Sequence, residues 1–191
     1  TINSAIIETE TVSAEPAKLA SFSDDEEVVL TGNCGANATF KVVKLDSSSM
    51  YSIYSLTISG SGAMYDYSMD NSLMRVTTAP WNEFASYIKS IEVSDEITKI
   101  GACAFAGLNC ASGDFPIPKK CTKIGNYAFN NCSGLGIYTE LSFPNTLTYV
   151  GEYAFFGCGY ETLVLPENLT YLGNYAFSNG RMAKGDLIIP A

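Results

Sequence analysis

The stretch "TYVGEYAFFGC", from Thr148 to Cys158, decides the fold, because the chain contains four closely related copies of it. The other copies are "TKIGACAFAGL" at 98–108, "TKIGNYAFNNC" at 122–132 and "TYLGNYAFSNG" at 170–180. Their first threonines are 24, 26 and 22 residues apart, and the glycine and the Ala-Phe pair keep the same steps. A fixed period of roughly 20–50 residues is the signature of a repeat architecture. The sequence therefore predicts a stack of similar coils.

A short alternating segment precedes each copy, and a fifth follows the last one: "SIEVS", "DFPIP", "ELSFP", "TLVLP" and "DLIIP". Alternate residues of a strand face opposite sides, so each segment is predicted to be a strand with one apolar face. The residues expected to point inward are Ile91/Val93, Phe115/Ile117, Leu141/Phe143, Leu163/Leu165 and Leu187/Ile189. Within each copy, the glycine is expected to allow a left-handed turn or a close approach between coils. The segment after it is predicted to be a short helical turn that places its phenylalanine in the core.

No single coil of this length can bury its apolar residues alone, whereas stacked coils bury a continuous core. We therefore predict an α/β repeat solenoid in which residues 89–191 form four full coils plus a fifth strand. Residues 29–88 are predicted to be a β-rich N-terminal cap, since "ATFKVVKL" and "YSIYSLTIS" are rich in β-branched and aromatic residues. Residues 1–28 form an acidic N-terminal segment.

The repeated block, x-L-x-h-P-x-x-L-T-x-I-G-x-x-A-F-x-x-C, resembles the BspA-like leucine-rich repeat. The segments "TGNCGANATFKV", "LTISGSGAMYDY" and "APWNEFASYIKSIEVSDEITKIG" resemble the cap that often precedes such repeats, so the resemblance covers about 29–191. It departs from the pattern where "SNG" stands in place of the fourth cysteine and where "TF" replaces the usual cap tryptophan. The resemblance implies right-handed coils behind the cap, in a surface or secreted protein of bacteria that binds other molecules.

Charge and composition exclude several classes of function. The net charge is −9, and the 11 Lys and Arg residues are scattered, so the basic footprint that nucleic-acid binding needs is missing. No apolar run reaches the ~20 residues that span a bilayer, so no membrane insertion is expected. The chain has no histidine, which removes Ser-His-Asp and Cys-His catalysis and His-containing zinc sites. We expect no catalytic residue, no cofactor and no metal ligand.

Three other patterns have weak functional interpretations. "DDEE" at 24–27 lacks the D-x-D-x-D-G spacing of a calcium loop and is predicted to be a solvated lead-in. "GSGAMY" at 60–65 lacks the third glycine of a dinucleotide-binding loop and is predicted to be a turn. Asp114, Glu140 and Asp186 offer carboxylates for glycoside hydrolysis, but nothing in the sequence implies a cleft around them.

The cysteines occupy positions that belong to the core of the repeat. Cys132 and Cys158 are equivalent, and Cys121 takes the place of Leu147 in the next coil. Free cysteine packs as a small hydrophobic residue, so the thiols of the chain are predicted to be mostly free and buried: Cys34, Cys103, Cys110, Cys121, Cys132 and Cys158. Equivalent positions in stacked coils lie ~5 Å apart, so a disulfide stays geometrically possible.

Tyrosines recur at equivalent positions as well. Tyr127, Tyr153 and Tyr175 follow the glycine of the last three copies, and Tyr149 and Tyr171 lie nearby. Such a row either covers the edge of the coils with its hydroxyl groups in water, or binds sugars or a protein partner.

We expect a non-catalytic adhesion module that recognises a host or neighbouring-cell protein through the exposed sheet face. The candidate partner-binding residues are Glu92, Asp114, Glu140, Ser142, Thr162, Val164, Asp186 and Ile188. Alternatives are a glycan-binding module that uses the tyrosines, or a passive spacer. The chain opens with "TINSAIIETE", which has no basic or apolar leader region, so an extracellular location implies a signal peptide already removed. Because "DLIIPA" begins a fifth coil, we also expect either a longer natural chain or self-association through residues 178–191.

Overall fold

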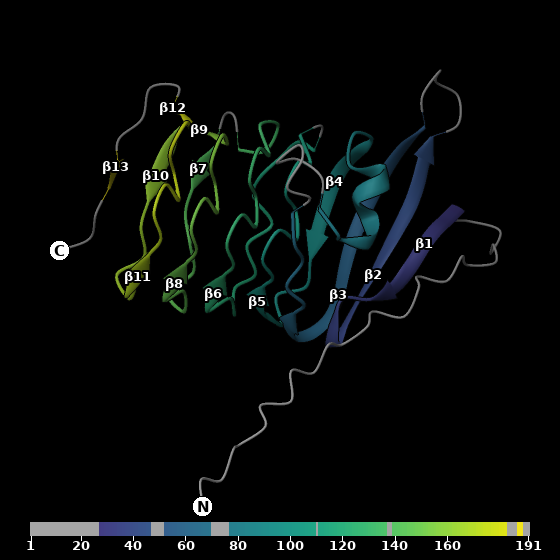
Figure 1. The fold of residues 1–191 in the computed structure, drawn as a ribbon, viewed down its shortest axis with the longest axis horizontal. Helices are drawn as coiled ribbons and strands as arrows, with labels where there is room; N and C mark the ends of the chain where they lie inside the picture. The colour runs from purple at the N-terminus through teal and green to yellow at the C-terminus, as the bar shows by residue number, and fades with distance from the viewer. Residues whose placement is uncertain are drawn as a thin grey trace, which may run out of the picture.

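In a computed structural model of the chain, the described residues are 27–46, 52–69, 77–109, 111–136, 139–182 and 187–188. They form strands and turns, and their one helical element is a 3-10 helix, η1 (Pro80–Phe84). The strands are β1 (Glu27–Asn33), β2 (Gly35–Asp46), β3 (Ile53–Met64), β4 (Ile88–Val93), β5 (Ile97–Ile100), β6 (Lys123–Ile124), β7 (Glu140–Leu141), β8 (Tyr149–Val150), β9 (Gly159–Tyr160), β10 (Thr162–Val164), β11 (Tyr171–Leu172), β12 (Arg181–Met182) and β13 (Leu187–Ile188). Figure 1 shows long strands at one end and short, regularly spaced strands toward the other. None of the described residues form a helix long and apolar enough to cross a membrane.

The cap is an antiparallel arrangement of β1, β2 and β3, and β3 starts the repeats. The first half of β3 pairs in parallel with β4, and its last residues, Gly62 and Ala63, pair in parallel with β5. Trp81 of η1 fills the junction: its indole N–H donates to the Ala104 carbonyl oxygen (2.9 Å), and its ring lies 5.0 Å from that of Phe40. The cap therefore supplies both a strand and an aromatic ring on which the first repeat stacks.

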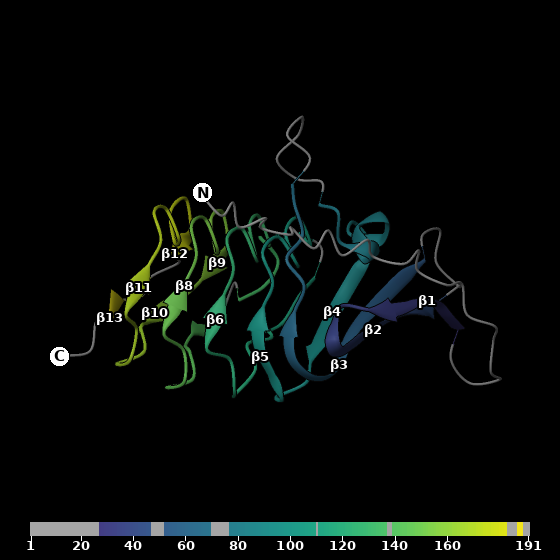
Figure 2. The ribbon, with the colours of Figure 1, turned by 60° about the horizontal axis from the view of Figure 1, so that its bottom comes forward.

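Successive repeats stack through three parallel ladders. The first runs β5-β6-β8-β11, the second β7-β10-β13 and the third β9-β12 (Figure 2). Paired residues are one repeat apart, as with Lys123 and Tyr149 in the first ladder and Leu141 and Leu163 in the second. The side chain of each repeated threonine adds a rung, because the Thr148 hydroxyl donates to the Thr122 carbonyl oxygen (3.2 Å). The sequence period is therefore also the spatial period.

The helical turn predicted after each glycine is wrong. Bonds of the i→i+3 kind are present, such as Ala128 N–H to the Gly125 carbonyl oxygen (3.3 Å), but Tyr127 has φ 57°. A left-handed residue interrupts a right-handed helix. The N–H of Phe129 instead donates to the Ala154 carbonyl oxygen of the next repeat (2.8 Å). Hydrogen bonds between repeats therefore replace those that a helix would form within one, and the described residues contain no α-helix.

Two other predictions about strands differ from the structure. No strand forms at 114–118, where Pro116 and Pro118 remove two backbone donors. The segment that contains Glu92 is a strand, but β4 pairs with β3 of the cap and not with the next repeat. The sheet face expected from five equivalent strands is therefore divided between the cap and the second ladder.

The repeated glycines allow backbones to approach closely, which is the second of the two roles expected for them. None of Gly101, Gly125, Gly151 and Gly173 has a positive φ. A Cβ atom added to Gly125 would lie 2.7 Å from the Ala102 Cα, and one added to Gly173 would lie 2.8 Å from the Glu152 Cα. Real Cβ atoms do not approach backbone atoms this closely.

We expect Gly125→Ala to lower the free energy of unfolding by about 3 kcal/mol, the upper end of the usual range for overpacking, because two backbones would have to separate. Gly62→Ala is the control: its Cβ would meet nothing within 4 Å, and only its φ of 81° opposes the change. The control should lose about 1–2 kcal/mol. Denaturant titration of both variants gives the comparison, and equal losses would contradict close packing at Gly125.

The core is built around a column of aromatic rings. Centroid distances are 5.1 Å from Phe105 to Phe129, 5.2 Å from Phe129 to Phe155 and 5.3 Å from Phe155 to Phe177, with the rings near parallel. The apolar residue before each glycine is fully buried in the first three repeats, whereas Leu172 is 47% exposed. Leu172 lies in β11, the last strand of its ladder, so no described strand covers it.

The described cysteines confirm the prediction of free, buried thiols at five positions: Cys34, Cys103, Cys121, Cys132 and Cys158. Cys110 lies outside the described residues. Three of the thiols bond between repeats: Cys132 Sγ donates to the Phe105 carbonyl oxygen (2.9 Å), Cys158 Sγ to that of Phe129 (3.0 Å) and Cys103 Sγ, at a longer distance, to that of Asn126 (3.9 Å). Burial raises the pKa of Cys121 to about 11 and that of Cys158 to about 12.

Alkylation measures this thiol state directly. In the native protein near neutral pH, we expect these buried thiols to react slowly, because the thiolate is the nucleophile and burial suppresses it. In denaturant without a reductant, all six cysteines of the chain should react, and intact-mass measurement would show six adducts. Two missing adducts would indicate a disulfide and overturn the prediction.

Candidate functional site

The outward-facing residues predicted to bind a partner do not form one surface. Glu92 lies on β4 opposite Thr57 of the cap, and Asp114 is exposed in an irregular segment. Glu140 and Thr162 are direct neighbours in the second ladder. Val164 pairs with Ile188 in that ladder, Ser142 is exposed just after β7, and Asp186 lies outside the described residues. The structure thus brings together the pairs Glu140/Thr162 and Val164/Ile188 in the second ladder, and places Glu92 apart from them, beside the cap.

The recurring tyrosines form two stacks. In the first stack, the ring centroids of Tyr127 and Tyr153 are 5.0 Å apart at an interplanar angle of 3°, and those of Tyr153 and Tyr175 are 5.0 Å apart at 21°. All three residues have a φ between 54° and 57°. This backbone conformation, supported by hydrogen bonds between repeats, turns each ring away from the core and onto the ring of the next repeat.

The second stack lies on the outward face of the first ladder. Tyr149 and Tyr171 are paired strand neighbours whose ring centroids are 4.4 Å apart at 7°. Lys123 precedes them in the same row, and its Nζ lies 4.2 Å from the centroid of the Tyr149 ring. This geometry is a cation–π contact, in which the negative face of the ring attracts the ammonium.

Glu152 is in the turn that connects Tyr149 of the second stack to Tyr153 of the first. Its backbone is held in place because the Glu152 N–H donates to Asn126 Oδ1 of the preceding repeat (3.0 Å). The pKa of Tyr127 is raised mainly by burial, then by Tyr153 and Glu152, and that of Tyr171 mainly by Tyr149, then by burial and Glu152. The Glu152 carboxylate is therefore within electrostatic reach of both stacks.

The two stacks and the residue between them in the chain are grouped here as the tyrosine surface: Tyr127, Tyr149, Glu152, Tyr153, Tyr171 and Tyr175. Tyr171 is 43% exposed and Tyr175 is 60% exposed, whereas the other tyrosines of the surface are half-buried. The surface combines ring edges, hydroxyl groups and one carboxylate. Such groups can accept hydrogen bonds and attract cations.

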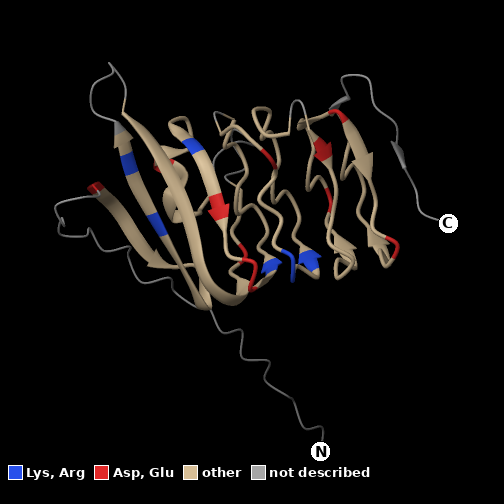
Figure 3. Cartoon of the chain, turned by 180° about the vertical axis from the view of Figure 1, so that it is seen from behind, with Lys and Arg blue, Asp and Glu red and all other residues tan. Residues whose placement is uncertain are grey.

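Charge is distributed unevenly along the stack of repeats. Residues 124–180 contain four glutamates and no lysine or arginine. In Figure 3 the blue segments lie on the cap and the first repeats, and the later repeats show only red segments. All residues of the tyrosine surface belong to this acidic part of the chain, and Lys123 directly precedes it.

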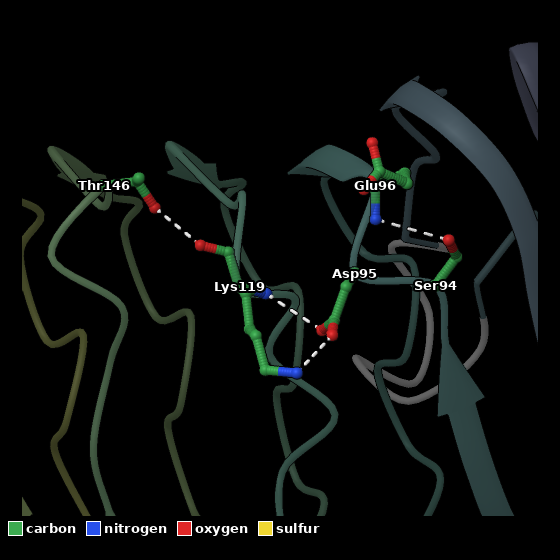
Figure 4. Close-up of polar contacts among 5 residues, drawn as sticks. All are labelled: Ser94, Asp95, Glu96, Lys119 and Thr146. Carbon is green, nitrogen blue, oxygen red and sulfur yellow. Dashed lines mark hydrogen bonds and ion pairs between the residues drawn. The ribbon is translucent and has the colours of Figure 1, made fainter.

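The lysines of the early repeats are mostly used in ion pairs between repeats. Lys119 Nζ lies 2.5 Å from Asp95 Oδ2, and the Lys119 N–H also donates to this carboxylate (3.2 Å; Figure 4). Thr146 continues the same line by donating to the Lys119 carbonyl oxygen (3.1 Å). Lys120 pairs with Glu96 (2.6 Å). These exposed contacts align neighbouring repeats and leave few cations for an external ligand.

Sequence reasoning found the tyrosines but missed Lys123 and Glu152. Lys123 occupies the row position that Tyr149 and Tyr171 fill in the later repeats, so the repeat alignment contains the signal for its contact. Glu152 was equally visible, between two tyrosines of one copy. No group of three or more Cys, Asp or Glu residues in the described ranges is arranged to hold a metal ion.

Comparisons with known proteins agree with the repeat. The model of the BspA type leucine-rich repeat region matches in six copies across residues 36–136 and 136–187. A leucine-rich repeat protein of Eubacterium ventriosum has a crystal structure that aligns with 78% of this chain, at 28% identity and a TM-score of 0.57. This chain covers 35% of that protein, so it spans about a third of its length.

A second solved structure is that of a leucine-rich cell surface protein from Faecalibacterium prausnitzii, with 18% identity and a TM-score of 0.30. The alignment covers 84% of this chain and 53% of that protein's chain. No curated protein matches the chain. The family match covers the cap from residue 36 as well as all four copies of the repeated phrase. The chain belongs to the BspA-type leucine-rich repeat family.

Proposed function

We propose that this chain is a non-catalytic binding module of a bacterial cell-surface or secreted protein, and that it binds another protein outside the cell. Membership of the BspA-type family supports the location, because its repeats resemble those of surface and secreted proteins. The three parallel ladders favour a single right-handed solenoid, which would hold the binding groups in fixed positions.

The observation that carries the proposal is the pair of tyrosine stacks. Tyr side chains provide a large amphipathic contact at a low cost in conformational entropy, and they are enriched where proteins bind proteins. Here each ring is already held by a neighbour about one strand spacing away, as with Tyr127 and Tyr153 at 5.0 Å. Pre-ordered side chains lose little further freedom on binding, which favours affinity.

The same geometry favours a protein ligand over a glycan. A sugar packs against the open face of an aromatic ring, whereas Tyr153 has a ring stacked on each side, Tyr127 and Tyr175. Ring edges and hydroxyl groups remain available, and these can donate to and accept from a peptide backbone. Glycan binding stays the second candidate, through Tyr171 and Tyr175, the most exposed tyrosines of the surface.

The outward row of the second ladder is the other candidate contact surface. Glu140, Thr162 and Val164 lie together there, with Ser142 close to Glu140 in the chain. The tyrosine surface is the stronger candidate because its rings are already held in place by stacking, as with Tyr149 and Tyr171 at 4.4 Å.

A binding screen with three matched variants tests the proposal. The intact chain would be presented to purified extracellular matrix proteins and to a glycan array. Tyr153→Asn removes a stacked ring without straining the backbone, since Asn tolerates a positive φ. Thr162→Lys changes the other candidate surface, and Tyr87→Ser removes an exposed tyrosine of the cap.

We expect binding to at least one protein, lost in Tyr153→Asn and retained in the other two variants. Loss in Thr162→Lys alone would move the contact to the second ladder. Binding to glycans only would support the alternative ligand class, and binding to nothing would support a passive spacer.

A further inference from the structure

We infer that Asp66 is an acid-sensitive clamp that holds the cap on the first repeat, because its carboxylate makes there the contact that the Asn126 side chain makes between two later repeats. The inference concerns how the stack of repeats begins. It goes beyond the proposed function and does not depend on it. It stands on two sets of hydrogen bonds and one ion pair.

The segment that follows β3 lies against the first repeat as one repeat lies against the next. The N–H of Tyr67, in this segment, donates to the Ala102 carbonyl oxygen (2.8 Å). Between the second and third repeats, the N–H of Tyr127 donates in the same way to the Glu152 carbonyl oxygen (2.9 Å). Ala102 and Glu152 are equivalent, since each directly follows the glycine of its copy. The end of the cap therefore takes the place of a preceding repeat, although its sequence, "MYDYSM" at 64–69, does not match the repeated phrase.

The residue before each of these two tyrosines adds a side-chain bond. Asp66 Oδ1 accepts a hydrogen bond from the Ala102 N–H (2.8 Å), and Asn126 Oδ1 accepts one from the Glu152 N–H (3.0 Å). Between the first and second repeats the equivalent residue is Ala102, which has no side-chain acceptor. The contact is therefore a property of particular side chains and not of every interface in the stack.

Asp66 differs from Asn126 in its charge. Its Oδ2 lies 2.6 Å from Lys99 Nζ on β5, so one carboxylate bonds two groups of the first repeat. The Asp66 side chain is 56% exposed, and exposed ion pairs are weak. The bond to the Ala102 N–H therefore carries most of the clamp, and the negative charge strengthens that bond.

Acid should weaken the clamp. Burial acts to raise the pKa of Asp66, but the hydrogen bonds from Lys99 and Ala102 and the charges of Lys99 and Lys123 lower it overall from its ordinary value of 3.8. A group whose pKa is lowered by folding contributes stability that is present above the unfolded pKa and is lost as pH falls through the folded value. The neighbouring thiol and phenol groups stay uncharged in acid: Cys103, Tyr65 and Tyr67.

Trp81 gives a local readout of the junction between cap and first repeat. It is the only tryptophan of the chain, it is 1% exposed, and its indole N–H donates to the Ala104 carbonyl oxygen. The test combines urea unfolding, followed by Trp81 fluorescence, with hydrogen exchange of the Ala102 amide, followed by NMR.

Three variants separate the two contacts of the carboxylate. Asp66→Asn keeps an oxygen that can accept from the Ala102 N–H and removes the ion pair, whereas Asp66→Ala removes both. The matched control is Asp95→Asn, which removes the ion pair with Lys119 (2.5 Å) between two repeats.

At pH 6 we expect the Ala102 amide to exchange roughly tenfold faster in Asp66→Ala than in wild type, because it loses its acceptor. Its exchange should stay within about threefold of wild type in Asp66→Asn and Asp95→Asn. The urea midpoint of Asp66→Asn should lie about 0.3 M below that of wild type at pH 6. This gap should narrow as the pH falls below 3.8, since the wild-type carboxylate is then protonated as well.

Two results would overturn the inference on their own. The first is an Ala102 amide that exchanges as slowly in Asp66→Ala as in wild type. The second is a gap in urea midpoint that is the same at pH 6 and at about pH 3. Equal acceleration of exchange in Asp95→Asn would show a general loosening of the stack and would overturn it as well.

Discussion

Phe155→Ala should lower the free energy of unfolding by about 3–5 kcal/mol, the range for removing a large buried aromatic side chain. Phe155 has no exposed surface, and its ring is stacked between Phe129 (5.2 Å) and Phe177 (5.3 Å). Two more rings, those of Phe115 (5.3 Å) and Phe143 (5.6 Å), meet it edge-on. The cavity would therefore open in the middle of the column, where no neighbour can collapse without leaving another ring unsupported.

Tyr153→Ala is the matched comparison, because it also removes a ring from a stack of three, but on the surface. Tyr153 is half-buried, and its stack is open to water along the ring edges. We expect its loss to be smaller than that of Phe155→Ala by at least ~2 kcal/mol. Denaturant titration of both variants measures the difference. Equal losses would show that the assignment of inward and outward positions is wrong.

The repeat period and the inward residues could be read from the sequence because both are carried by side-chain chemistry that recurs. Ile124 and Val150 stand at equivalent positions and are fully buried, as their apolar character predicts. The roles of the glycines could be narrowed only to two, since close approach and a positive φ both favour glycine. The structure decides for close approach at Gly125 and Gly173.

The helical turn could not be excluded from sequence because local preference and long-range hydrogen bonding point in different directions. Alanine favours a helix, whereas the Phe129 N–H finds its acceptor on Ala154, 25 residues away in the chain. The same limit applied to Tyr127, since a positive φ is uncommon for tyrosine and nothing local predicts it. The sequence showed only that tyrosine recurs at equivalent positions of the repeats. This predicted a row of tyrosines but not the direction in which their rings point.

The arrangement of the outward-facing residues was predicted less well than the core for a related reason. The expected row assumed that every alternating segment joins one sheet, and the two prolines of 114–118 and the cap strand β3 prevent this. Which strands pair depends on the whole stack of repeats. The residues next to Glu92 in the sequence therefore could not show that its strand pairs with the cap while that of Glu140 pairs with a later repeat. The tyrosine stacks were found because they follow the period itself.

Alkaline pH should destabilise the reduced protein steeply above about pH 9. Burial raises the pKa of Cys34 from the ordinary 9.0 to about 12 and that of Cys103 to about 11. Burial also raises the pKa of Cys132. Above pH 9 the unfolded chain releases thiol protons that the folded chain retains, so the unfolded state binds fewer protons. Stability is then fully present below about pH 9 and falls as pH rises toward the folded-state pKa values.

Each such thiol lowers the free energy of unfolding by up to about 1.4 kcal/mol per pH unit. Several thiols together therefore lower it by more than most single substitutions do. Urea titrations at intervals from pH 8 to 10, with a reductant present, measure the slope before most tyrosines titrate. Cys158→Ala should be less stable at pH 8 and should reduce the slope above pH 9 by the share of one thiol, because Cys158, with a pKa of about 12, keeps its proton when folded. A stability that stays flat up to pH 10 would mean that the thiols are already oxidised or reach solvent in the folded chain, and either result would contradict a core built on free cysteines.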